Sequence, residues 1–85
     1  MKMKITHIDH SHNEDFTVEL NERFYIEVRT DIYPNKTRTA LEVSIFCGVN
    51  EQGEQYQIRE ERVPMFKEAI QEFVNKDPYY FGYKL

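Results

Sequence analysis

Apolar side chains recur at every second position along much of the chain, and this period of two constrains the fold more than any other feature. It runs through residues 16–20, 24–32 and 41–49. Such alternation is typical of strands with one buried and one wet face, as in antiparallel sheets. We predict an antiparallel meander of four or five strands, at about residues 3–8, 15–20, 24–32, 39–49 and 54–60.

After Ile58 the spacing of apolar residues changes to about 3.6, the period of a helix with one apolar face. That face would be formed by Val63, Phe66, Ala69, Ile70, Phe73 and Val74. Pro64 suits the first turn, where a missing N–H is no loss, and Pro78 ends the helix. We predict an α+β fold with one amphipathic helix at about 63–76, packed on one face of the sheet. The aromatic tail, 79–85, is expected to dock on the helix or a sheet edge.

Length and composition favour one small soluble domain spanning residues 1–85. The 85 residues leave room for one hydrophobic core, and 40% hydrophobic with 31% charged residues is ordinary for a folded chain. The one cysteine, Cys47, allows no intrachain disulfide. No segment after Met1 resembles a signal peptide, and no apolar run approaches the ~20 residues of a membrane span. We expect a cytoplasmic protein without membrane contact.

The alternation also predicts how the strands pair, because residues opposite one another must face the same side. A loop at residues 21–23 and a turn set by Pro34 define the first two hairpins. The expected opposite pairs are Leu20–Phe24, Val18–Ile26, Arg29–Glu42 and Tyr25–Phe46. In the third hairpin Gly53 is available for a positive φ angle.

A histidine-rich segment follows the first predicted strand and contains candidate metal ligands. Imidazole and carboxylate groups bind zinc and other transition metals. The candidates are His7, Asp9, His10 and His12. A solvated polar loop explains the same composition more simply, so we expect neither a metal nor another cofactor.

No catalytic motif accompanies the nucleophilic side chains. Cys47 is in phase with Val43 and Ile45, which predicts a buried small hydrophobe rather than a reactive thiol. The three glycines, Gly48, Gly53 and Gly82, form no loop that could cradle a phosphate. We therefore expect no enzymatic activity.

The face of the sheet away from the helix is the better candidate for a site. On the expected pairing it presents two aromatic side chains next to arginines, a combination typical of protein contact surfaces. The expected partner-binding residues are Tyr25, Arg29, Phe46, Gln57 and Arg59. The alternatives are that the tail folds back and covers this face, or that these are ordinary exposed aromatic residues without a binding role.

In size, charge and architecture the chain resembles small acidic α+β proteins that phages and mobile elements use as inhibitors of host proteins. Its net charge of −4 and the free sheet face carry the resemblance. Anti-CRISPR proteins and other anti-defence inhibitors belong to this group. The resemblance implies a non-enzymatic protein-binding module that occupies a partner's surface. The sheet face or an edge strand could also support a two-fold homodimer.

The order of four strands and a helix also resembles the positive-cofactor transcriptional coactivator family, through Gly53–Tyr56 and the helix Pro64–Lys76. This resemblance implies a dimer that binds single-stranded nucleic acid. Its bases would stack on Tyr25 and Phe46, with Arg29 and Arg59 on the phosphates. The turn sequence NEQGEQ is acidic where that family is lysine-rich, so nucleic acid ranks below protein as a partner. A metal-binding role through His7, His10 and His12 ranks third.

Overall fold

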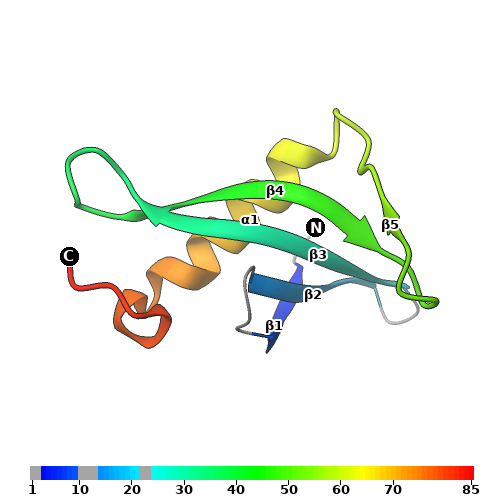
Figure 1. The fold of residues 1–85 in the computed structure, drawn as a ribbon, viewed down its shortest axis with the longest axis horizontal. Helices are drawn as coiled ribbons and strands as arrows, with labels where there is room; N and C mark the ends of the chain where they lie inside the picture. Colours follow the sequence, from blue (N-terminus) through cyan, green and yellow to red (C-terminus); the bar gives the residue numbers. More distant parts are fainter. Residues whose placement is uncertain (1–2, 10–13, 22–23) are drawn as a thin grey trace.

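A computed structural model describes residues 3–9, 14–21 and 24–85 of the chain (Figure 1). These residues form an antiparallel sheet in the order β1-β2-β3-β4-β5, followed by the helix α1 and the 3-10 helix η1. The strands are β1 (Lys4–Asp9), β2 (Glu14–Asn21), β3 (Phe24–Pro34), β4 (Leu41–Val49) and β5 (Gln55–Tyr56). The helices are α1 (Val63–Asn75) and η1 (Pro78–Phe81). The predicted α+β class, a β-meander with a C-terminal helix, is confirmed.

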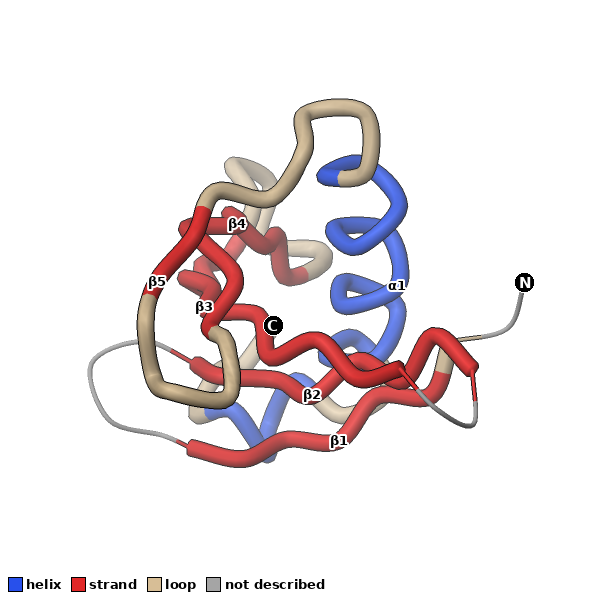
Figure 2. Tube along the Cα trace, turned by 90° about the vertical axis from the view of Figure 1, so that its right-hand side faces the viewer, coloured by secondary structure: helices blue, strands red, loops and turns tan. Residues whose placement is uncertain are grey.

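The sheet is curved, and α1 lies against its concave side. Figure 1 shows α1 behind β3 and β4. In Figure 2, β3, β4 and β5 stand to the left of α1, and β1 and β2 run beneath it. We call the side that faces α1 the inner face and the opposite side the outer face. No helix of the described residues lies on the outer face.

The core lies between α1 and the inner face. Opposite pairs such as Phe16–Val28 and Ile32–Val43 supply its sheet side, and these four side chains are buried. The buried residues of α1 are Phe66, Ile70 and Val74. Burying a side chain of this size stabilises the fold by about 1.5–3 kcal/mol relative to exposure. The helix α1 therefore supplies most of the buried side chains opposite the inner face, and Phe81 and Tyr83 of the tail pack beside them.

Two amide side chains of α1 bind the backbone of β4 along its edge. The Val43 N–H donates to Oε1 of Gln71 (3.1 Å), and the Leu41 N–H donates to Oδ1 of Asn75 (2.8 Å). Asn75 Nδ2 donates in return to the Leu41 carbonyl (3.0 Å). Four residues of helix rise about 6 Å, close to the two-residue step of a strand. The strand β5 pairs only with Gly48 and Val49, at the other end of β4. At Leu41 and Val43 the helix side chains therefore take the place of a neighbouring strand.

The aromatic tail docks on the inner side of the sheet. The Phe81 ring lies 5.4 Å from the ring of His7 and 6.2 Å from that of Phe16, centroid to centroid. The Tyr83 hydroxyl donates to the Ile32 carbonyl at 2.8 Å. The Phe81 ring also lies 6.5 Å from that of Phe73 on α1, so the expected docking on the helix is found. The alternative, in which the tail covers the outer face, is wrong.

The ends of two strands differ from the sequence-based expectation. Pro34 lies within β3, opposite Leu41, because the terminal position of a strand tolerates a residue without an N–H. The turn is organised instead by Asn35, whose Oδ1 accepts a hydrogen bond from the Thr39 N–H (2.8 Å). The strand expected at 54–60 is only Gln55–Tyr56, and the chain leaves the sheet before α1.

We expect Asn75→Ala to lower the free energy of unfolding by about 2 kcal/mol. The truncation removes both hydrogen bonds to Leu41 and leaves its backbone N–H and carbonyl without these partners at the sheet edge. Urea denaturation followed by circular dichroism measures the change. Lys76→Ala, at the next and exposed position, is the control. Equal stability of the two variants would contradict the proposed closure of the β4 edge.

Candidate protein-contact surface

The outer face of β2 and β3 is set by the residues that alternate with the core. Val18 lies opposite Ile26 on the inner side, as the sequence predicts. The pairs on the outer side are Asp15–Arg29, Thr17–Glu27 and Glu19–Tyr25. Both Tyr25 and Arg29, two of the expected partner-binding residues, therefore lie on the outer face of one strand.

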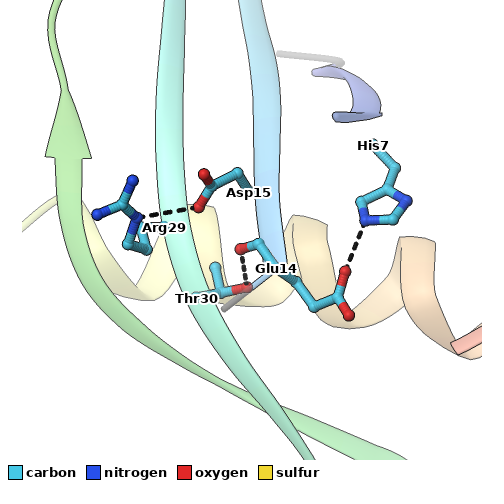
Figure 3. Close-up of polar contacts among 5 residues, drawn as sticks. All are labelled: His7, Glu14, Asp15, Arg29 and Thr30. Atoms are coloured by element: carbon cyan, nitrogen blue, oxygen red, sulfur yellow. Dashed lines mark hydrogen bonds and ion pairs between the residues drawn. The ribbon is translucent and has the colours of Figure 1, made fainter. Parts of the chain in front are cut away.

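An ion pair fixes the position of Arg29 on this face (Figure 3). The Arg29 Nε donates to Asp15 Oδ1 at 3.2 Å, and the Asp15 side chain is only 8% exposed. This hydrogen bond and the negative charge of Asp15 raise the pKa of Arg29 above its usual value. Arg29 itself stays partly exposed. Its charge is thus held in place and accessible from the outer side.

Asp15 was missed as a site residue, although the sequence contains the signal for it. The pairing of Val18 with Ile26, extended along the same two strands, places Asp15 opposite Arg29. A charged residue directly before the buried Phe16 also stands at an outward position. A test for opposite charges across the strands would have found this pair.

A bulge in β4 decides which residues join Arg29. Arg29 lies opposite Cys47, whereas the next residue of β3, Thr30, lies opposite Ile45. Phe46 is therefore an extra residue in β4, and it is 54% exposed. Beyond the bulge the phase of β4 is reversed, so Cys47 shares the outer side with Arg29. The expectation that Cys47 points into the core is wrong.

The expected pairing of β3 with β4 is also wrong. Glu42 lies opposite Tyr33 rather than Arg29, and Tyr25 has no partner in β4. The reason is that β3 continues to Pro34, which shifts the turn and the pairing along both strands. In the first hairpin Asn21, not Leu20, lies opposite Phe24, because the pairing is irregular after Glu19. At this end of β3, Tyr25 lies opposite Glu19 of β2.

The outer face combines exposed aromatic side chains with acidic groups. Tyr25 is 62% exposed, and Tyr33 adds a third aromatic ring, whose hydroxyl accepts a hydrogen bond from Ser44 at 3.3 Å. The acidic residues at outward positions, in addition to Asp15, are Glu19, Glu27, Asp31 and Glu42. The basic residues there are Lys4 and Arg29. The face is therefore aromatic and net acidic.

Gln57 and Arg59 do not lie with the other expected partner-binding residues. They line a separate cleft of about 220 Å³ beyond the end of β5, together with Ile26, Tyr56, Ile58, Arg62 and Phe66. Two members of that set, Ile58 and Phe66, belong to the buried core below α1. The structure thus divides the expected contact residues between the outer face and this cleft.

The candidate metal ligands fall partly outside the described residues. His7 lies on the inner side, with its Nε2 2.6 Å from Glu14 Oε2, as Figure 3 shows. His10 and His12 lie outside the described residues, and only the backbone of Asp9 is described. Within the described part of the chain, no three His, Cys, Asp or Glu side chains are grouped so that they could hold a metal ion.

Comparisons with protein-family models, with curated proteins and with solved structures returned no match for this chain. In the ranges that the structure describes, no helix combines the length and the apolarity needed to cross a bilayer. The outer face and the clefts are therefore interpreted from their own geometry and chemistry.

Gly48 is the point where β4 accepts the ring of Tyr56. A Cβ atom at Gly48 would overlap with Cζ of the Tyr56 ring. We expect Gly48→Ala to destabilise the fold by about 1–3 kcal/mol, the usual range for overpacking. In the background of Tyr56→Ala the same substitution should cost much less, because the obstructing ring is gone. Chemical denaturation of the four proteins of this double-mutant cycle measures the difference.

Proposed function

We propose that this chain is a non-enzymatic protein-binding module whose outer sheet face contacts a partner protein. The observation that carries the proposal is the exposure of two aromatic side chains, Tyr25 at an outward position of β3 and Phe46 at the bulge of β4. The helix α1 and the aromatic tail pack against the opposite, inner face. Aromatic side chains have large apolar surfaces and form most of the strong contact points in protein interfaces. Leaving two of them in water on a rigid sheet is unfavourable for the free chain and favourable for binding.

The charges of the outer face support a partner with a basic surface. Glu19, Glu27, Asp31 and Glu42 occupy outward positions of β2, β3 and β4, while Asp15 pairs with Arg29. Opposite charges across an interface accelerate association and exclude partners of the wrong sign. The partner surface would therefore present an apolar patch within a basic rim.

The finer form of this proposal is an inhibitor encoded by a phage or mobile element that occupies the surface of a host protein. Such a role needs only a rigid face with complementary shape and charge, and no reaction chemistry. The same acidic side chains disfavour contact with a phosphate backbone. Single-stranded nucleic-acid binding therefore remains the second candidate, and a metal-dependent role ranks below it.

The test is copurification of a protein with the tagged chain from cells of its source organism, followed by affinity measurement with the purified partner. We expect the Tyr25→Ser and Phe46→Ser variants each to weaken binding about tenfold or more, as truncation of a central aromatic contact does. The association rate should also fall as salt is raised, because salt screens the acidic face.

Tyr79→Ser is the matched control, because Tyr79 is 71% exposed and lies on the tail rather than on the outer face. It should bind the partner as the unsubstituted chain does. Unchanged affinity of both outer-face variants would overturn the assignment of this face. Salt-sensitive binding of an oligo-dT probe, lost in the same two variants, would favour nucleic acid instead.

A further inference from the structure

The two edges of the sheet are treated differently. Along β4, the amides of Gln71 and Asn75 bind the backbone that β5 leaves open. At the other edge, β1 pairs with β2, and no other described strand lies beside it. An edge strand presents a row of N–H and carbonyl groups that can pair with a further strand. Among the described strands, β1 is therefore the side on which this sheet can be extended.

A cavity runs beside this edge, between β1 and α1. It has a volume of about 800 Å³. Its lining residues are Met3, Lys4, Ile5, Met65, Glu68, Ala69, Glu72, Phe73 and Lys76. The apolar members form much of the lining, and Met65 is 43% exposed to solvent. We call this cavity the β1–α1 groove.

We propose that the β1–α1 groove binds an extended segment of a partner protein, which adds to β1 as a further strand. The proposal rests on the protein-binding function proposed above and names a second mode of contact. A groove between a free strand edge and a helix matches the needs of strand addition. The backbone of β1 would form hydrogen bonds with the backbone of the incoming segment, and every second side chain of that segment would enter the groove.

The lining defines the chemistry of that segment. Side chains that point toward α1 would meet Met65, Ala69 and Phe73, so these positions should be apolar and of moderate size. The charged members of the lining are two acids and two lysines, which favours a segment with both signs of charge on its flanks. The expected pattern is an alternation of aliphatic residues with lysine and glutamate.

A second copy of this chain is a poorer occupant. Pairing β1 with its own copy would bring the inward positions Ile5 and His7 to the other molecule's groove. Ile5 already lines its own groove, and His7 is engaged with Glu14 and packed against Phe81. Neither side chain is available to fill the groove of the other copy. A separate segment with its own apolar side chains would fill it.

The experiment uses a panel of short acetylated and amidated peptides in which one aliphatic residue alternates with lysine and glutamate. Amide hydrogen exchange of the full chain is followed by NMR at millimolar peptide. We expect at least one peptide to slow exchange of edge amides in β1 about tenfold or more, and to shift the signals of groove residues. N-methylation of alternate peptide bonds removes donors but keeps the side chains, and should abolish the protection.

Ala69→Phe fills the groove and should weaken binding of the peptide at least tenfold. Lys67→Phe places the same ring at an exposed position of α1 outside the groove and should leave binding unchanged. Circular dichroism verifies that both variants are folded. The N-methylated peptide keeps the test valid should either variant fail to fold.

Three results would overturn the proposal: no protection of β1 by any peptide, equal binding of the N-methylated form, or protection of β1 in a dimer of the free chain. The last is detected as a doubled mass in sedimentation. Failure of the groove proposal can be distinguished from failure of the outer-face proposal. A partner lost by Tyr25→Ser but kept by Ala69→Phe leaves the protein-binding function standing and removes the groove from it.

Discussion

The burial of a single helix face against a curved sheet is the interaction on which the rest of this structure depends. Phe66, Ile70 and Val74 fill the concave side, and the amides of Asn75 and Gln71 bind the adjoining strand edge. A chain with one long helix can cover one side of its sheet in this way. The outer face and the β1 edge are left open as a direct result, and both proposed contact regions arise from this limit.

The parts of the fold that were predicted correctly depend on local spacing. A period of two identifies strands and a period of 3.6 identifies the helix, because each pattern is imposed by the burial of one side. The pairing of Val18 with Ile26 follows from the same requirement, and it correctly places Tyr25 and Arg29 on the outer side. Pro64 correctly predicted the start of α1, which begins at Val63. Gly53 correctly predicted a positive φ angle in the third hairpin.

The parts that were not predicted depend on single-residue irregularities and on distant contacts. The bulge at Phe46 changes the side on which Cys47 lies, yet the sequence around it alternates without interruption. Gln57 and Arg59 line a separate cleft instead of the predicted sheet face, because β5 ends at Tyr56. The hydrogen bond from Leu41 to Asn75 joins residues far apart in sequence, so no local sequence pattern predicts it.

The replacement of a strand by helix side chains has a consequence for the behaviour of this protein at high concentration. Helix ends fray more easily than sheet centres open, and Asn75 is the last residue of α1. When its final turn unwinds, the N–H and carbonyl of Leu41 lose their Asn75 partners while the sheet remains intact. The uncovered segment alternates aliphatic residues and lacks proline, which is a composition prone to fibril formation. We therefore expect the last turn of α1 to protect this end of the β4 edge from pairing with strands of other molecules.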